Sequence, residues 1–155
     1  MTDFSDLLLP QTVSQGIALP GKKAVLQHVA TIAAAAHGVD QKAALTVLAD
    51  RERLGSTGFG GGIAIPHGRL DGIAHPVGVF VRLAEPIDFQ SVDDLPVDLI
   101  FMMLSSPDAG ADHLKSLARI SRRLRDRHFV AKLRGAGSPD ALYALWTAED
   151  ARDAA

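Results

Sequence analysis

The sequence predicts a single α/β domain of the mixed α+β kind, in which a sheet of about five strands carries helices on both faces. Helical and strand-like patterns intermix along the chain, they follow no regular strand–helix–strand rhythm, and one strand-like segment is apolar almost throughout. The 155 residues fit one domain, 1–155, with a core spanning roughly 5–150. No internal repeat or linker divides the chain.

Two amphipathic helices are predicted in the first third of the chain, after a short candidate strand near Val13. From Lys22 onward, apolar residues recur at three- and four-residue steps, and Gly38 supplies a stop signal. Asp40 is a suitable N-cap for the second helix, which is expected to end near Leu54. Because only a few residues join them, the two helices should form a hairpin that covers one face of the sheet.

Three strands are predicted in the middle of the chain. Residues 63–65 form an apolar triplet typical of a short buried strand, and Pro66 is expected to end it. Residues 77–83 alternate, with four apolar side chains on one face and Phe80 and Arg82 on the other. Residues 97–104 are apolar almost throughout, which is typical of a central strand covered on both sides.

Two further helices are predicted in the last third of the chain. The first begins near Asp112 and runs to about Arg127. Its expected buried stripe consists of Leu114, Leu117, Ser121 and Leu124. The second opens at residues 138–140, where serine, proline and aspartate occupy the positions that favour a helix start.

Composition excludes several classes of function. The net charge of −2 gives no basic field for nucleic acid. The chain has no cysteine, which excludes disulfides, thiolate catalysis and thiolate metal sites. The acidic N-terminus does not resemble a signal peptide, and the apolar run 99–104 is far shorter than the ~20 residues that span a bilayer. We therefore expect a cytoplasmic protein with no membrane insertion and no nucleic-acid partner.

The most distinctive segment of the chain is glycine-rich and ends in a histidine. Five of the eight residues from Gly55 to Gly62 are glycine, which gives more backbone freedom than a plain connection needs. The apolar triplet and Pro66 follow, and then come His67, Gly68 and the cation Arg69. A titratable side chain at a strand end, framed by flexible backbone and positive charge, suits phosphate chemistry. We hypothesise that His67 carries a phosphoryl group. The glycines, which have no side chains, would form a low rim beside it, so that a partner protein can reach it.

Other uses of this segment fail on sequence grounds. A P-loop needs a lysine after its glycines, and no lysine lies between Lys42 and Lys115. The glycines follow a helix and precede a strand, which is the reverse of the dinucleotide fingerprint, and no serine sits in a Gly-x-Ser-x-Gly elbow. The six histidines show no i, i+4 ligand pair. No cofactor and no metal are expected.

Phosphohistidine chemistry remains. A neutral imidazole nitrogen is a good nucleophile near pH 7, because its ordinary pKa is about 6.5. Transfer from another phosphohistidine exchanges one N–P bond for another, so the protein has to supply alignment and charge stabilisation. Backbone N–H groups and cations near the histidine can provide donors for the phosphoryl oxygens.

The residues match the pattern of a known family. The segment 55–69, Gly-Ser-Thr-Gly-Phe-Gly-Gly-Gly-Ile-Ala-Ile-Pro-His-Gly-Arg, resembles the signature of the IIA domains of the mannitol/fructose type in the bacterial phosphotransferase system. It is most similar to the nitrogen-regulatory members of that family. The resemblance extends to residues 77–81, 96–101 and 113–124, and covers most of the chain from Arg51 onward.

The resemblance implies a mechanism and a set of site residues. His67 would accept a phosphoryl group on its tele nitrogen from the phosphohistidine of an HPr-like carrier, called NPr in the nitrogen branch. The second family histidine corresponds to His113, at the start of a helix, and the family arginine corresponds to Arg51. The family fold, a mixed five-stranded sheet flanked by helices, agrees with the fold predicted above. The chain would then be a phosphotransferase that acts through a phosphohistidine intermediate.

Alternatives exist for each of these residues. Without its flanking motif, His67 would be read as an ordinary surface or core histidine. His113 is compatible with a tolerated first-turn position, and Arg51 with a solvated helix end. Arg69 and the basic surface of the helix after Asp112 are expected to be solvated.

Two roles fit the proposed chemistry. The first is a regulatory carrier whose phosphorylation state decides its partners, which in this family include potassium transport systems and sensor kinases. The alternative is a component of a fructose/mannitol-type sugar transport system that passes the phosphoryl group to a separate IIB domain. We expect the regulatory role, because the sequence contains no IIB domain and no membrane segment.

Overall fold

The computed structural model describes residues 3–148 of the chain. The expected domain core therefore reaches slightly beyond them, since residues 149 and 150 lie outside the described part. The elements follow one another as η1 (Pro10–Thr12), β1 (Val13–Ile17), α1 (Lys22–His37), α2 (Gln41–Arg53), β2 (Gly58–Gly60), β3 (Ile63–Ala64), β4 (His67–Arg69), β5 (Val77–Ile87), β6 (Val97–Ser105), α3 (Ala111–Leu124), α4 (Arg127–Gly135) and α5 (Pro139–Thr147).

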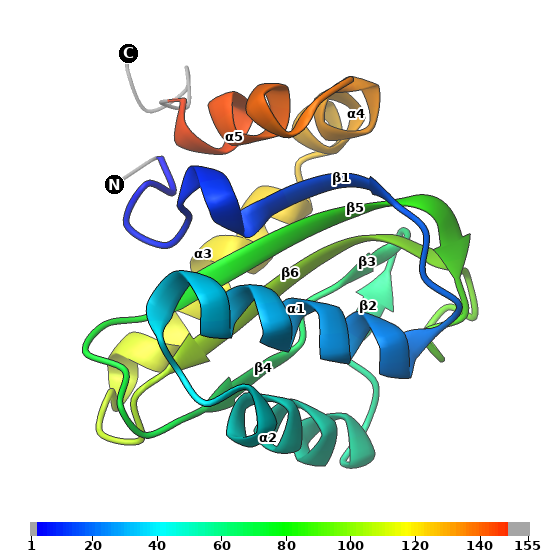
Figure 1. Cartoon of the computed structure of the whole chain (residues 1–155). Helices are drawn as coiled ribbons and strands as arrows, with labels where there is room; N and C mark the ends of the chain where they lie inside the picture. The colour runs from blue at the N-terminus through cyan, green and yellow to red at the C-terminus, as the bar shows by residue number, and fades with distance from the viewer. Residues whose placement is uncertain (1–2, 149–155) are drawn as a thin grey trace.

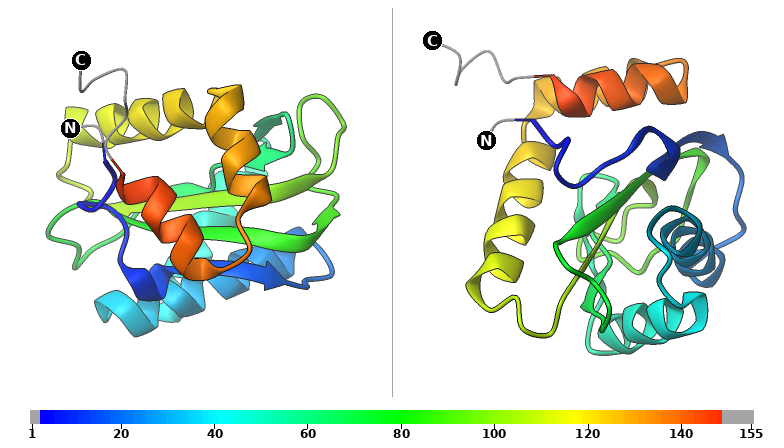
Figure 2. Two further views of the ribbon diagram at one scale, coloured as in Figure 1. Left: turned by 90° about the horizontal axis from the view of Figure 1, so that it is seen from above. Right: turned by 60° about the vertical axis from the view of Figure 1, so that its left-hand side comes forward.

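One mixed sheet lies between two helical layers, which confirms the predicted fold class (Figure 1). Its strand order is β1-β5-β6-β3-β2, and β4 also pairs with β6. Strands β1 and β5 run parallel, β5 and β6 antiparallel, and both β3 and β4 run parallel to β6. Helices α1 and α2 cover one face, while α3, α4 and α5 lie over the other (Figure 2).

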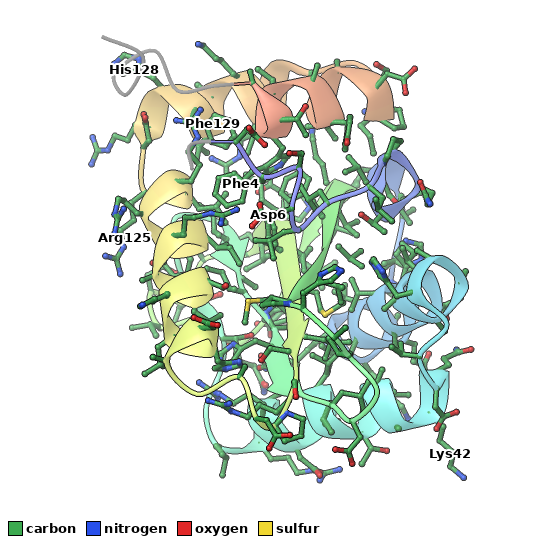
Figure 3. The ribbon with its side chains drawn as sticks, turned by 90° about the vertical axis from the view of Figure 1, so that its left-hand side faces the viewer. Phe4, Asp6, Lys42, Arg125, His128 and Phe129 are labelled. Carbon is green, nitrogen blue, oxygen red and sulfur yellow. The ribbon has the colours of Figure 1, made fainter. Side chains whose placement is uncertain are left out.

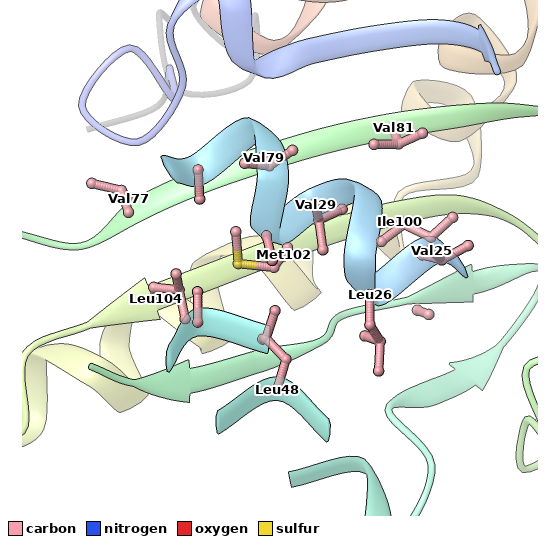
Figure 4. Close-up of a cluster of buried hydrophobic side chains, with 14 of the residues drawn as sticks. Val25, Leu26, Val29, Leu48, Val77, Val79, Val81, Ile100, Met102 and Leu104 are labelled. Carbon is pink, nitrogen blue, oxygen red and sulfur yellow. The ribbon is translucent and has the colours of Figure 1, made fainter. Parts of the chain in front are cut away.

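The first face of the sheet packs against the helical hairpin as predicted. Gly38 ends α1 in the left-handed conformation, and the Asp40 side chain accepts a hydrogen bond from the N–H of Ala43 at the start of α2. The alternation in β5 directs its valines toward this layer. The buried residues that meet there include Val25, Leu26, Val29, Leu48, Val77, Val79, Val81, Ile100, Met102 and Leu104 (Figure 4).

The opposite face is built around aromatic rings. Trp146 of α5 makes edge-on contacts with Phe4, Phe80, Phe101 and Phe129, with ring centroids 4.9–5.1 Å apart. The N-terminal segment is also tied to α3, because Asp6 accepts hydrogen bonds from Arg119. Phe4 and Phe129 are buried in this layer, whereas Arg125, at the C-terminal end of α3, is exposed (Figure 3). These contacts fix α3, which carries one of the predicted site residues, over the sheet.

Strands β3 and β4 correct one prediction. The first strand ends before Pro66, as predicted, but His67 does not simply follow the end of that strand, because the chain pairs with β6 again after the interruption at residues 65–66. Ile63 and Ala64 lie opposite Leu99 and Ile100, and His67 lies opposite Met103. Proline lacks an N–H, yet its carbonyl accepts a hydrogen bond from the N–H of Met103, so the edge continues past it. His67 is therefore the first residue of a strand. The interruption also explains why the sheet has six strands rather than about five.

The third predicted helix is also corrected. It ends at Leu124, and a separate helix, α4, follows from Arg127 because Asp126 caps it by accepting hydrogen bonds from the N–H groups of His128 and Phe129. Its buried stripe consists of His113, Ile120 and Leu124, while Leu114, which was expected in the stripe, is 66% exposed. The helix is thus rotated so that a histidine, rather than a leucine, faces inward.

Candidate functional site

His67 is held at the start of β4 in one tautomer. Its Nδ1 lies 2.8 Å from the backbone carbonyl of Ile65. A carbonyl oxygen can only accept, so Nδ1 carries a proton and donates it. Burial, together with the nearby charge of Arg51, lowers the pKa of His67 below its usual value, although the Ile65 hydrogen bond and Glu52 act in the opposite direction. The ring is therefore neutral at pH 7, with a lone pair on Nε2, on the side of the ring away from Ile65.

His113 lies beside His67, as the sequence predicted for a shared site. The two ring centroids are 5.9 Å apart and the ring planes are inclined by 55°. His113 belongs to the first turn of α3 and is 6% exposed. Burial and the charges of Arg69 and His67 lower its pKa. Its Nδ1 makes a hydrogen bond with the hydroxyl of Ser105, the last residue of β6.

Arg51 reaches the same place from α2. It lines, together with His67, a shallow cleft of about 250 Å³, whose other lining residues are Ser56, Thr57, Phe59, Ile65, Val92, Leu117, Ser121 and Arg125. One guanidinium nitrogen, Nη1, donates to the carbonyl of Gly55 at 2.9 Å. The remaining guanidinium N–H groups of Arg51 are not engaged in any hydrogen bond within residues 3–148. The fold therefore assembles the three predicted residues from β4, α3 and α2.

A buried carboxylate, which sequence reasoning missed, supports the backbone behind His67. Glu52 accepts hydrogen bonds from the N–H (3.0 Å) and hydroxyl of Thr57, and pairs with Lys22 at 2.9 Å. The carbonyl of Thr57 in turn accepts from the N–H of Ile65, whose own carbonyl orients His67. Glu52 follows Ala44 and Leu48 at four-residue steps, so its place on the buried stripe of α2 was the available signal.

The glycines of the segment allow unusual backbone angles and close packing, and none of them lines the cleft. Gly60, Gly61 and Gly62 all have positive φ angles, and a Cβ at Gly58 would lie 2.3 Å from the hydroxyl oxygen of Ser91. Between Gly55 and Gly62, the residues that line the cleft are Ser56, Thr57 and Phe59. The rim that we expected around His67 is thus formed by side chains interspersed among the glycines.

Arg69 is exposed as predicted, and its charge also reaches one of the site residues. It is exposed, as expected for a solvated cation, and its Nη1 lies 3.5 Å from the carbonyl of Pro107. Its charge nevertheless acts on the buried His113. Within residues 3–148, no group of three or more histidine, aspartate or glutamate side chains is placed to hold a metal ion. No helix in that part of the chain has the length and apolar character needed to cross a bilayer.

Comparisons with known proteins identify the family to which the chain belongs. Residues 6–148 match the family described as "Phosphoenolpyruvate-dependent sugar phosphotransferase system, EIIA 2". A nitrogen regulatory protein of Bradyrhizobium diazoefficiens is 45% identical over 142 residues, which cover 92% of this chain and 93% of that protein. The crystal structure of the nitrogen regulatory protein IIA-Ntr from Neisseria meningitidis superimposes with a TM-score of 0.86 at 29% identity, covering 92% of this chain and 97% of that one. The IIA mannitol structure from Escherichia coli shares the fold, with a TM-score of 0.75 at 19% identity over 91% of this chain and 100% of that one.

Proposed function

Because the chain belongs to the EIIA 2 family of the phosphoenolpyruvate-dependent sugar phosphotransferase system, we propose that it is a phosphoryl carrier of the nitrogen-regulatory kind. His67 accepts a phosphoryl group from a phosphohistidine of an HPr- or NPr-like protein. The carrier then regulates partner proteins according to its phosphorylation state. One observation carries the chemical half of this proposal: the hydrogen bond from Nδ1–H of His67 to Ile65 leaves Nε2 as a nucleophile in a cleft that also contains Arg51.

The transfer step needs no proton to move. The lone pair on Nε2 of His67 forms the new N–P bond while the N–P bond of the donor breaks and its electron pair returns to the donor nitrogen. The His67 ring gains positive charge, and the Ile65 carbonyl stabilises that charge because Nδ1 keeps its proton. The phosphoryl oxygens carry negative charge throughout, and Arg51 and His113 are two groups beside His67 that can donate to them.

The surface around the cleft supports a protein as the donor. Leu54, Val92 and Leu114 are 84%, 80% and 66% exposed. Leu54 follows the helix that carries Arg51, Val92 lines the cleft, and Leu114 follows His113. Exposed large apolar side chains gathered around a polar site are typical of a protein interface. A shallow cleft also leaves His67 within reach of a histidine on another protein.

Phosphorylation in a reconstituted system tests the chemical half. The chain is incubated with phosphoenolpyruvate, enzyme I and the HPr-like carrier, and the incorporated phosphate should be labile in acid and stable in alkali. The variant His67→Ala should take up no phosphate. The matched control is His128→Ala, because His128 is exposed on α4 and does not line the cleft, so this variant should behave as the unmodified protein. Labelling of His67→Ala at the normal level would contradict the assignment.

The regulatory half needs a separate test. Phosphorylated and unmodified protein are each offered to purified candidate targets, including a potassium transport system and a sensor kinase, and to a fructose-type IIB domain. Binding that differs between the two states supports a regulatory carrier. Rapid transfer of the phosphoryl group to the IIB domain, with no state-dependent binding to the other targets, would instead assign the chain to sugar transport.

A further inference from the structure

Ser105 lies where its side chain can determine which ring nitrogen of His113 carries the proton. It is the last residue of β6, it is fully buried, and its hydroxyl contacts Nδ1 of His113. We propose that Ser105 is a positioning residue: its hydroxyl donates to Nδ1 of His113, and thereby holds His113 in the tautomer whose Nε2–H can donate to a phosphoryl group on His67. This inference rests on the function proposed above and assigns the proton that the supporting histidine needs.

The count of donors and acceptors decides the direction of this hydrogen bond. A hydroxyl has one proton, and the hydroxyl of Ser105 makes no hydrogen bond other than that to His113 within the described part of the chain. Because Ser105 is buried, water does not offer an alternative acceptor. If Nδ1–H of His113 donated to the hydroxyl oxygen, the serine proton would be buried without an acceptor, which is costly. If the hydroxyl donates to Nδ1, both the serine proton and Nδ1 of His113 have a partner.

The charge state of His113 makes this direction matter. Burial and the neighbouring charges of Arg69 and His67 favour the neutral ring. A neutral imidazole has one N–H, so the proton is on Nε2 only when Nδ1 accepts. With Nδ1–H instead, the ring would present a lone pair toward the negatively charged phosphoryl oxygens and repel them.

The two histidines of the site therefore have opposite partners at the same ring atom. The Ile65 carbonyl forces Nδ1 of His67 to donate and frees its Nε2 for bonding to phosphorus. The Ser105 hydroxyl lets Nδ1 of His113 accept and leaves a proton on its Nε2. Because the ring centroids are 5.9 Å apart, a phosphoryl group on one ring lies beside the other.

The tautomer can be measured without any substitution. Nitrogen-15 NMR of the histidine side chains at pH 7.5 distinguishes a protonated Nε2 from a protonated Nδ1. We expect His113 with its proton on Nε2 and His67 with its proton on Nδ1. A wild-type His113 with its proton on Nδ1 would overturn the inference, whether or not the protein accepts phosphate.

Variants at Ser105 connect the tautomer to the rate. Ser105→Ala should move the His113 population toward Nδ1–H and slow phosphoryl transfer by about tenfold, since a donor to the transferring group is lost in part. Ser105→Thr keeps the hydroxyl and should restore both the tautomer and most of the rate. A matched control is Thr12→Val, which removes another buried hydroxyl, in η1, away from the site, and should leave the rate unchanged.

The outcomes separate this inference from the proposed function. If Ser105→Ala leaves either the tautomer or the transfer rate unchanged, Ser105 is not a positioning residue. If the wild-type protein accepts no phosphate on His67 while His113 has the expected tautomer, the proposed function fails and the hydrogen-bond assignment stands. Should Ser105→Ala fail to fold, the wild-type spectrum and the Ser105→Thr rate still decide.

Discussion

His67 and His113 are the same side chain in two settings, and the settings support the different roles proposed for them. His67 sits on a strand and donates from Nδ1 to a backbone carbonyl, which cannot reverse the hydrogen bond. His113 sits in the first turn of a helix and faces a hydroxyl, which can donate or accept. The proposed nucleophile is thus oriented by the backbone itself, while the orientation of the proposed supporting group depends on one side chain. This difference leads us to expect that substitutions around His113 change the rate, whereas only His67 decides whether transfer occurs.

The largest effect separates the two histidines directly. His67→Gln should abolish phosphoryl acceptance, because the amide provides no nucleophilic nitrogen. His113→Gln should slow acceptance by roughly 100-fold, the scale for losing one donor to a developing or transferring anion. Rapid-quench measurement with phosphorylated NPr-like protein gives both rates. Equal loss in the two variants would remove the distinction between nucleophile and supporting residue.

Arg51 should have the next largest effect. Arg51→Ala is expected to slow acceptance by roughly 10- to 100-fold, because a charge-assisted donor to the phosphoryl oxygens is lost. Arg53→Ala is the matched control, since Arg53 lies in the same last turn of α2 but is exposed and pairs with Asp50. The two variants are compared in the same rapid-quench assay. A normal rate for Arg51→Ala would show that Arg51 is a solvated cation at a helix end with no role in binding the phosphoryl group.

Glu52 tests the support behind His67. Glu52→Gln leaves Lys22 without its carboxylate and weakens the hold on Thr57, so we expect the free energy of unfolding to fall by about 2–3 kcal/mol. Acceptance should slow only a few-fold, because His67 keeps its Ile65 partner. Urea denaturation measures the first quantity. The exposed Glu85→Gln serves as control, and an equal stability loss there would contradict the role given to the buried carboxylate.

The smallest effect is a pH dependence that both histidines share. Their pKa values in the folded protein lie below the ordinary value of about 6.5, so the unfolded chain binds more protons as the pH falls through that value. Their contribution to stability is therefore complete above pH 6.5 and declines below it. Denaturation midpoints at pH 7.5 and 5.5 should differ in that direction for the wild type. The difference should shrink in the His67→Gln and His113→Gln variants, and an unchanged difference would contradict the pKa directions.

The sequence predicted the parts of the fold that repeat a pattern. The alternation 77–83, the apolar run 97–104 and the capped hairpin before Gly55 each report burial at every second or every third to fourth residue, and the structure confirms all three. The prediction was wrong where a single residue determines the boundary of a helix. Asp126 starts a new helix two residues after α3 ends, and periodicity across that junction looked continuous.

The candidate site was predicted unevenly for a similar reason. His67, His113 and Arg51 belong to motifs, and the fold places Arg51 in the cleft that His67 lines and His113 beside the His67 ring. Ser105 bonds to His113 across the loop after β6, and Glu52 pairs with Lys22 of another helix, so no local pattern marks these partners. A lone hydroxyl at the end of a buried strand and a carboxylate on a buried helical stripe were the available signals.

The central claim is that the phosphoryl group is bonded to Nε2 of His67 while Nδ1 keeps its hydrogen bond to Ile65. Nitrogen-15 NMR of the phosphorylated protein, with labelled histidine, tests it most directly. We expect phosphorus coupling and a large shift at Nε2 of His67, with the Nδ1 proton retained. Phosphorus coupling at Nδ1, or on any residue other than His67, would contradict the account.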